Sequence, residues 1–310
     1  MEGVEKSEAA YVDDEIAQAQ VKIWRILFGF TEMAAAKCAV ELGIPDILEN
    51  HGDPMTLSQL SSALNCSSTA LFRIMRFLMN RGIFQEKITK QGSMGYAQTA
   101  LSRLLTKDGN ESLASMLLFQ SSSAIIAPWH YLSSRVLDDK TSAFVRAHGM
   151  DIWQHGAENP DDAKLLDEAM ASDTRRTIPA VLEGCPEIFD GLSSVVNVGG
   201  GDGTALRILI KACPWIRGIN FDLPRVNCRE AISEYGSAGK VIIVEAVIEE
   251  KGGDELKDGG LVLDMVMLAQ TDKGKERTAE EWTYVLREAG FTRHTIKNIQ
   301  SVLSVIEAFP

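Results

Sequence analysis

The sequence has 310 residues, of which 45% are hydrophobic and 24% are charged, a composition typical of a globular protein long enough for two domains. Its formal net charge of −12 argues against nucleic acid as a partner, because binding phosphates requires a basic surface. No apolar run reaches the length of a membrane span, and the acidic start of the chain does not resemble a signal peptide. We therefore expect a cytoplasmic protein that has no membrane partner.

The cysteines are scattered along the chain and form no C-x-x-C pair. There are five of them: Cys38, Cys66, Cys185, Cys213 and Cys228. This pattern indicates reduced thiols and argues against a zinc site, so we expect no bound metal.

Two helices are predicted near the N-terminus, over residues 14–30 and 31–42, because apolar residues recur there at helical spacing. The second contains the run Met33-Ala34-Ala35-Ala36, whose small side chains favour close contact between helices. Packing on a partner subunit and packing within the chain both fit this pattern.

Residues 55–86 have the pattern of a helix-turn-helix, with Thr56 or Ser58 as the first helix cap and a β hairpin after the second helix. The second helix carries three arginines, Arg73, Arg76 and Arg81. DNA binding by this helix is one interpretation. In so acidic a chain, a structural role for the motif is the better supported one.

The stretch from Val195 to Thr204, V-V-N-V-G-G-G-D-G-T, reads as a buried strand, a glycine turn and the start of a helix. The amide groups at such a helix start suit an anionic or polar group of a cofactor. A second strand ends in Asp222, which is 19 residues after Gly203. An acid at this distance can bind the two hydroxyls of a ribose. The alternative is a glycine-rich turn that binds nothing.

The C-terminal part reads as an α/β layer. Strands are predicted near residues 194–199, 218–222, 241–247, 291–297 and 301–308, and helices near 204–212, 227–235 and 278–289. Glu245 ends the third strand, at the edge of a parallel sheet where ligands bind. Glu276 precedes the last helix, where it could instead complement the helix dipole. Thr278 and Glu281 fit a capping box for that helix.

Taken together, these stretches resemble the plant small-molecule O-methyltransferases, which use S-adenosylmethionine to methylate phenolic hydroxyls. The resemblance covers about residues 18–310 and is most specific in four motifs, V-G-G-G-D-G-T from Val198, F-D-L-P from Phe221, G-K-V-I-I-V-E from Gly239 and G-K-E-R-T from Gly274. The ending S-V-I-E-A-F-P looks most like the branch that acts on benzylisoquinoline alkaloids, the norcoclaurine-type enzymes.

The resemblance implies a Rossmann-like α/β methyltransferase domain over residues 114–310 and a winged-helix domain over residues 1–113 that forms a homodimer and binds no DNA. It implies that Gly199, Gly201 and Asp222 hold S-adenosyl-L-methionine. It also implies that Glu245 and Glu276 flank the catalytic histidine. Three further positions match residues that line the substrate pocket: Met170, Met267 and Thr271.

The chain departs from the family between Val226 and Asn227, which are adjacent here. A family member has at this point a G-G-D-M-F segment and a strand that leads to H-D-W, the motif carrying the histidine base. The missing piece corresponds to a whole β-α-β step of roughly 30 residues or more. No H-D-W occurs anywhere in the sequence. We therefore expect an incomplete parallel sheet, in which the strands at 194–199 and 241–247 become neighbours.

Three functions remain open. The first is transfer of a methyl group to a phenolic hydroxyl of a plant alkaloid, phenylpropanoid or flavonoid, impaired by the loss of the histidine. The second is a non-catalytic relative or splice variant that dimerises through its N-terminal domain. A nicotinamide-dependent dehydrogenase is the third, and Thr204 at the last glycine of the dinucleotide fingerprint argues against it.

Overall fold

The computed structural model describes residues 2–107, 109, 111–221, 239–249, 255–299 and 301–310. It divides into two compact units, Met1–Leu117 and Leu118–Pro310. The division falls within helix α7 (Ala114–Gln120), whereas the sequence motifs placed the domain boundary after residue 113. The predicted helix near 227–235 and the junction of Val226 with Asn227 lie outside the described residues.

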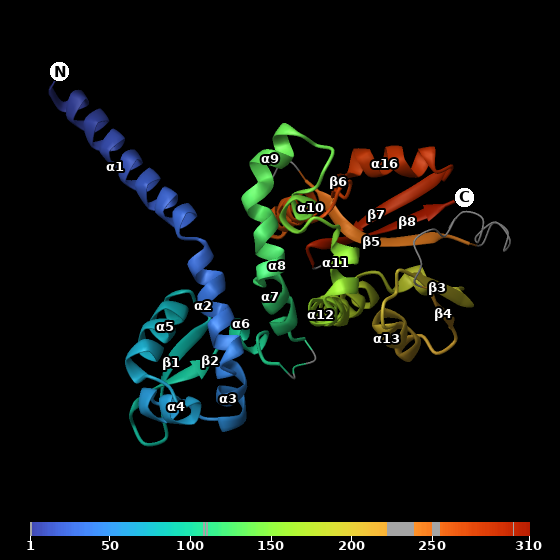
Figure 1. Ribbon diagram of the computed structural model, residues 1–310. Coiled ribbons are helices and arrows are strands. Elements are labelled where there is room, and N and C mark those ends of the chain that lie inside the picture. Colours follow the sequence, from blue (N-terminus) through green and yellow to red (C-terminus); the bar gives the residue numbers. More distant parts are fainter. Residues whose placement is uncertain (1, 108, 110, 222–238, 250–254, 300) are drawn as a thin grey trace. The chain divides into compact units, whose positions relative to one another are not determined.

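Unit 1 is a helical domain with one β hairpin (Figure 1). Before α7 its elements are, in chain order, α1 (Glu2–Leu27), α2 (Phe30–Glu41), α3 (Ile44–His51), α4 (Leu57–Leu64), α5 (Ser68–Asn80), β1 (Phe84–Ile88), β2 (Met94–Gln98) and α6 (Ala100–Arg103). The predicted helix-turn-helix and hairpin are confirmed as α4, α5 and the antiparallel pair β1–β2. Helix α1 begins at Glu2, whereas the sequence predicted a start at residue 14. The residues before 14 are mostly polar and lack the apolar periodicity from which a helix is predicted.

The core of unit 1 forms where α2 to α5 pack against the hairpin. Its fully buried side chains include Ile44, Leu60, Met75, Leu78 and Phe84. The cap of α4 is Thr56, whose hydroxyl accepts from the amide of Gln59 in a capping box. The sequence left Thr56 and Ser58 open as caps, and the Gln59 side chain decides between them because it completes the reciprocal bond.

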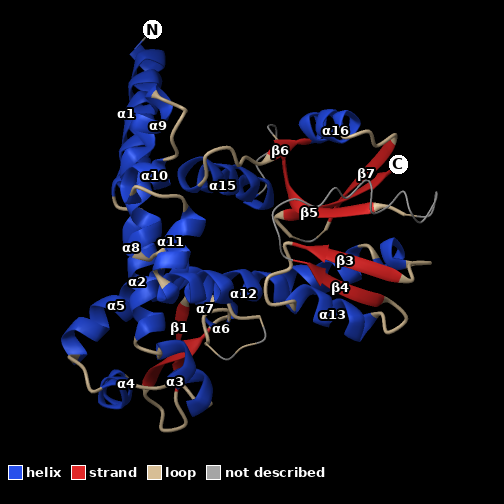
Figure 2. Ribbon diagram, turned by 45° about the vertical axis from the view of Figure 1, so that its right-hand side comes forward, coloured by secondary structure: helices blue, strands red, loops and turns tan. Residues whose placement is uncertain are grey.

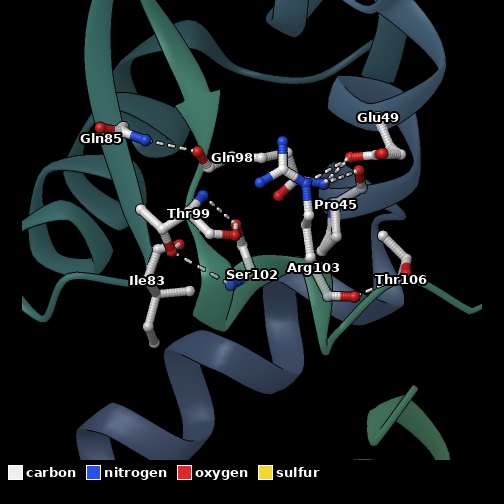
Figure 3. Close-up of polar contacts among 9 residues, drawn as sticks. All are labelled: Pro45, Glu49, Ile83, Gln85, Gln98, Thr99, Ser102, Arg103 and Thr106. Carbon is white, nitrogen blue, oxygen red and sulfur yellow. Dashed lines mark hydrogen bonds and ion pairs between the residues drawn. The ribbon is translucent and has the colours of Figure 1, made fainter. Parts of the chain in front are cut away.

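Buried polar bonds tie the hairpin to the neighbouring helices of unit 1 (Figure 3). The Nε2 atom of the buried Gln98 donates to the carbonyl of Pro45 at 2.7 Å, which joins the end of β2 to the first turn of α3. Thr99 donates to the carbonyl of Ile83 at 2.7 Å and also caps α6 through the amide of Ser102. The orientation of the hairpin therefore depends on hydrogen bonds as well as on the apolar core.

Unit 2 begins with helices and ends with strands. Its elements after α7 are α8 (Ser123–Ile126), η1 (Ala127–Tyr131), α9 (Leu132–Leu137), α10 (Ala143–His148), α11 (Ile152–Glu158), α12 (Pro160–Gly184), η2 (Pro186–Phe189), β3 (Ser194–Val198), α13 (Thr204–Ala212), β4 (Arg217–Phe221), β5 (Val241–Ile248), α15 (Glu255–Gln270), β6 (Arg277–Thr278), α16 (Ala279–Glu288), β7 (Arg293–Asn298) and β8 (Leu303–Phe309). Five of the strands match predicted ones, whereas α15 and the short β6 were not predicted. Among the described helices, none combines the length and the apolarity that crossing a membrane requires.

The strands of unit 2 form two separate sheets (Figure 2). Strands β3 and β4 pair in parallel, with Val198 opposite Phe221. The other sheet has the order β6-β5-β8-β7, in which β5 is parallel to β6 and antiparallel to β8. The expected pairing of β3 with β5 is therefore wrong, and within the described residues β3 pairs only with β4.

Both sheets pack against one hydrophobic cluster. Val195 of β3 and Val244 of β5 contact the same hydrophobic cluster, which includes Val181 of α12 and Leu209 of α13. Each strand therefore packs on these helices, while no backbone pairing joins β3 to β5 in the described residues. The prediction treated strand spacing as a matter of backbone pairing alone.

A buried ion pair joins the residue before β5 to β8, the two central strands of the larger sheet. The Nζ atom of Lys240 lies 2.6 Å from Oε1 of Glu307 on β8, and both side chains are about nine-tenths buried. Lys297 of β7 lies 3.4 Å from the other carboxylate oxygen of Glu307. Desolvation alone would raise the pKa of Glu307, but the hydrogen bond and charge of Lys240, together with Lys297, hold that pKa below its ordinary value.

Replacing Glu307 by Gln is expected to lower the free energy of unfolding of unit 2 by about 3 kcal/mol at neutral pH, because it leaves the Lys240 ammonium buried without a counter-charge. The native pKa is depressed, so this difference is present above about pH 4.3 and disappears as the pH falls through the folded pKa. Urea unfolding at several pH values measures it. Glu288→Gln, a change at an exposed site on α16, serves as the control and should alter stability little.

Candidate active site

The glycine turn after β3 has the geometry that its sequence predicts. Gly199, Gly201 and Gly203 adopt φ angles of +66°, +48° and +80°, a region that other residues enter only with strain. The amide of Gly203 donates to the carbonyl of Gly200 at 2.8 Å and closes the turn. A Cβ atom built at Gly199 or at Gly201 meets open space, so a ligand can approach the backbone closely at these two positions.

A pair of asparagines fixes the turn to the two strands below it. The side chain of Asn197 on β3 donates to Oδ1 of Asn220 on β4 at 3.0 Å, and Nδ2 of Asn220 donates to the carbonyl of Gly201 at 3.1 Å. A Cβ atom at Gly200 would lie 2.0 Å from Oδ1 of Asn220, which explains why this position is also glycine. The two asparagines are 23 residues apart, so no local pattern in the sequence predicts that they pair.

At the start of α13, the side chain of Asp202 binds the first residue of the helix. Asp202 accepts from the amide of Thr204 at 2.9 Å and from its hydroxyl at 2.9 Å. These bonds, with Thr204 as the main donor and Arg207 as a second, hold the pKa of Asp202 below its ordinary value. The amide of Thr204 already donates to the carboxylate of Asp202. A cofactor group at this helix start would therefore have to bind through the other amides. Asp222 follows β4 directly but lies outside the described residues.

The two predicted catalytic acids come together at the junction of β5 and β6. Parallel pairing places Val247 opposite Arg277, and the charge of Glu245 acts on Glu276. Glu276 exposes only 8% of its surface, whereas the side chain of Glu245 opens to solvent. A third carboxylate, Asp264 of α15, accepts from the backbone amide of Glu276 at 2.9 Å and fixes its position.

Burial shifts the pKa of both acids upward. Burial raises the pKa of Glu276 to about 7, with smaller contributions from Glu245 and Asp264 that Arg277 only partly offsets. The pKa of Glu245 is raised as well, because protein packs densely around a side chain that nonetheless reaches solvent. The arrangement can therefore hold a proton near neutral pH, which an ordinary pair of surface glutamates cannot.

The predicted substrate-pocket residues fall into two places. Met267 and Thr271 lie one helical turn apart at the end of α15, where the Thr271 hydroxyl donates to the carbonyl of Met267 and accepts from the amide of Gly274. This places them on the chain segment that leads to Glu276. Met170 lies on a different helix, α12, with 45% of its surface exposed, and its pocket role stays a prediction.

Four of the five histidines of this chain have hydrogen-bond partners other than the two acids. His148 contacts the carbonyl of Ala124, His155 contacts Asp162, and the rings of these two histidines lie 4.8 Å apart. His294 contacts the hydroxyl of Thr283, and His51 contacts the carbonyl of Asp53. Within the described residues, the charged groups that act on Glu276 are Glu245, Asp264 and Arg277, with no histidine among them.

Models of protein families match most of the chain. A model described as the O-methyltransferase dimerisation domain matches residues 24–108, and one described as the O-methyltransferase domain matches residues 129–228 and 226–292. The chain belongs to the O-methyltransferase family.

Curated relatives of this O-methyltransferase come from plants. Acetylserotonin O-methyltransferase of Arabidopsis thaliana is 39% identical over 96% of this chain and 94% of the relative. Flavonoid 4'-O-methyltransferase 5 of Ocimum basilicum is 40% identical over 96% of this chain and 100% of the relative. The alkaloid branch is represented by (RS)-norcoclaurine 6-O-methyltransferase of Thalictrum flavum subsp. glaucum, which is 32% identical over 96% and 99% of the two chains.

Solved structures share the fold. Human N-acetylserotonin methyltransferase in complex with SAM aligns with a TM-score of 0.78 at 17% sequence identity, over 94% of this chain and 97% of that one. The expected fold class, a methyltransferase domain with a helical dimerisation domain, is therefore confirmed, with the sheet mixed rather than purely parallel.

The alignments with relatives also contain an interruption. The alignment with the Arabidopsis enzyme spans 359 positions, whereas this O-methyltransferase has 310 residues, so at least 49 positions hold a residue of the relative and none of this chain. The family model matches its methyltransferase domain in two pieces that meet at residues 226–228.

Replacing Glu276 by Gln is expected to stabilise this O-methyltransferase at alkaline pH. The raised pKa of Glu276 means that the native protein loses stability as the pH rises from about 4.3 to about 7, because the folded state then has to ionise a buried acid. The difference in unfolding free energy between the variant and the native chain should be up to ~3 kcal/mol more favourable to the variant at pH 8 than at pH 4. Thermal unfolding across this range measures the effect, and two parallel stability curves would contradict it.

Proposed function

We propose that this chain is an S-adenosyl-L-methionine-dependent O-methyltransferase that acts on a phenolic hydroxyl of a plant secondary metabolite, with weakened cofactor binding and slowed methyl transfer. The observation that carries the proposal is that Glu245, with Asp264, acts on the buried Glu276 without a histidine among the charged groups around it. The predicted pocket residues Met267 and Thr271 lie on the chain segment that leads to Glu276. The flavonoid and alkaloid relatives support a phenolic substrate.

The residues of the glycine turn fit the cofactor. Open space above Gly199 and Gly201 allows the backbone to approach the cofactor, and the Asn197–Asn220 pair holds the turn in place without filling that space. Asp222, the next residue in the sequence after β4, would receive the ribose hydroxyls. When bound, S-adenosyl-L-methionine supplies an electrophilic methyl group on a positively charged sulfur.

The interruption at residues 226–228 supports the two deficits. Cofactor sites bury most of their ligand, so loss of the wall that would contact the adenine weakens binding. A phenol with a pKa near 10 is protonated at neutral pH, and a positioned base that removes the proton contributes typically 10²–10⁴-fold to the rate. Without a histidine beside the carboxylates, we expect methyl transfer at least ~100-fold slower than in a relative that has one.

Calorimetry with S-adenosylhomocysteine, together with a methyl-transfer assay on flavonoids, tests this function. The native chain should bind weakly and react slowly. Inserting the corresponding segment of the Arabidopsis relative between Val226 and Asn227 should raise both, and Asp222→Ala in the restored chain should abolish binding. A native chain that turns over as fast as its relatives would refute the impairment.

A second function, a non-catalytic chain that acts by dimerisation, is favoured by unit 1. The family model for dimerisation covers residues 24–108. Apolar side chains crowd the surface of α1 and the start of α2: Ile16, Val21, Ile23, Trp24, Ile26, Leu27, Phe28 and Phe30 are exposed. A stripe of this kind on an otherwise acidic protein is typical of a subunit interface.

The dimer makes a separate prediction. Light scattering should give twice the monomer mass at micromolar concentration, and Trp24→Glu should shift the protein toward monomer, because Trp24 is 63% exposed and becomes buried only if a partner covers it. Lys22→Gln, at an exposed position on the same helix, is the control matched for a change of one unit of net charge. A native monomer would argue against both the dimer and this second function.

A further inference from the structure

The connection between α15 and β6 folds back on the end of its own helix. The hydroxyl of Thr271 donates to the carbonyl of Met267 at 2.8 Å and accepts from the amide of Gly274 at 2.8 Å. A Cβ atom built at Gly274 would collide with the Thr271 hydroxyl oxygen and lie 3.3 Å from the Met267 sulfur, so the backbone packs directly on both side chains. Further along, the amide of Glu276 donates to Asp264 of α15 at 2.9 Å. The connection and the last turns of α15 therefore form one packed unit.

Three residues of other elements hold this unit from outside. Nη2 of Arg135 on α9 donates to the carbonyl of Asp272 at 2.7 Å. The backbone amide of Ser142, at the start of α10, donates to the carboxylate of Asp272 at 2.9 Å. The side chain of Gln270 donates to the carbonyl of Ile125 at 3.0 Å. Helix α10 packs against α15 and lies at one end of it (Figure 2). The position of the connection thus depends on α8, α9 and α10.

Arg135 is the buried cation of this contact, with 8% of its surface exposed. Its guanidinium also donates to the carbonyl of Asp139, just after α9, so its plane is fixed between two backbone carbonyls. The hydrogen bonds of Ser142 and the charge of Arg135 hold the pKa of Asp272 below its ordinary value. The carboxylate of Asp272 is therefore ionised at neutral pH and compensates the buried cation.

The residues that this contact holds are those predicted to line the substrate pocket. Met267 and Thr271 are half-buried, so part of each side chain is open to a ligand. We propose that Arg135 is a positioning residue for the phenolic acceptor: through Asp272 it holds the connection from α15 to β6, and with it Met267 and Thr271, in the arrangement that the acceptor contacts. This inference rests on the proposed function, because it takes these two residues as part of the acceptor site.

The role of Arg135 is separable from cofactor binding. The glycine turn is held by the side chains of Asn220 and Arg207, which donate to its carbonyls. Removing the Arg135 side chain takes the donor from the carbonyl of Asp272 and allows the connection to shift, whereas the glycine turn keeps its bonds. The affinity for an acceptor should therefore fall while the affinity for the cofactor stays the same.

Calorimetry on the full chain compares Arg135→Ala and Arg135→Lys with Arg287→Ala, the control at an exposed arginine of α16. The acceptor probes are naringenin, a flavonoid with free phenolic hydroxyls, and N-acetylserotonin, and the cofactor probe is S-adenosylhomocysteine. Arg135→Ala should weaken acceptor binding roughly 10-fold, because a charged hydrogen bond is lost, and leave S-adenosylhomocysteine binding unchanged. Arg135→Lys should fall in between, since an ammonium lacks the planar fork that spans two carbonyls. Arg287→Ala should change neither affinity.

Chemical rescue separates positioning from a loss of folding. Millimolar guanidinium should restore acceptor binding to Arg135→Ala, because the ion can occupy the space between the carbonyls of Asp139 and Asp272. Urea at the same concentration has a similar shape and no charge, and should not restore binding. In a variant that is merely destabilised, neither compound would help, and S-adenosylhomocysteine binding would fall together with acceptor binding.

Hydrogen exchange of the unliganded protein follows the connection directly. Arg135→Ala should speed exchange at the amides of Gly274 and Glu276 and leave β3 and β4 as in the native chain. Unchanged exchange at these two amides would overturn the inference, and so would equal losses of affinity for acceptor and cofactor.

Failure of the proposed function gives a different result. A native chain that binds neither acceptor nor S-adenosylhomocysteine refutes the proposed function, and the acceptor role of Arg135 with it. A native chain that binds S-adenosylhomocysteine and neither acceptor leaves cofactor binding in place and overturns the inference.

Discussion

Unit 2 depends on one hydrophobic cluster that lies under both of its sheets. Val181, Ile188 and Leu209 form its buried centre, and valines of β3 and β5 contact it from the two sheets. No backbone pairing joins β3 to β5 among the described residues, so this packing is what holds the glycine turn and the carboxylate pair within the same unit. A methyltransferase domain with an incomplete sheet keeps its architecture because the helices, more than the ladder of hydrogen bonds, determine where each strand lies.

Sequence reasoning succeeded where the relevant physics is local. The turn at Gly199 to Gly203 followed from glycine's freedom at positive φ, and the Thr278–Glu281 capping box and the bounds of α13 followed from residues within one helical turn of each other. It failed for α15, whose apolar run contains Gly259 and Gly260 and shows little helical periodicity. The partnership of Asn197 with Asn220, and of Glu276 with Asp264, depends on how distant segments pack, and no pattern in the sequence encodes it.

The candidate site shows how family membership and the chemistry of a particular chain can differ. The resemblance identifies the carboxylates Glu245 and Glu276. It does not predict that Glu276 is buried near two other acids, or that the neighbouring Arg277 donates to a backbone carbonyl. Such an arrangement costs folding free energy, because an ionised acid is removed from water without a compensating charge. In unit 1, by contrast, the buried Gln98 carries no charge, and its Nε2 atom donates to the carbonyl of Pro45.

The free side of β3 has a consequence for the life of the chain in a cell. Strand β3 is paired on one side only in the described structure, and its outward valines, Val196 and Val198, are 49% and 45% exposed. An edge strand with unpaired backbone groups and apolar side chains is a template on which other extended chains aggregate. Natural edges carry lysine, proline or a bulge as protection, and the sequence S-V-V-N-V of β3 has none of these. We therefore expect the soluble yield of this chain to depend on chaperone capacity as well as on its folding free energy.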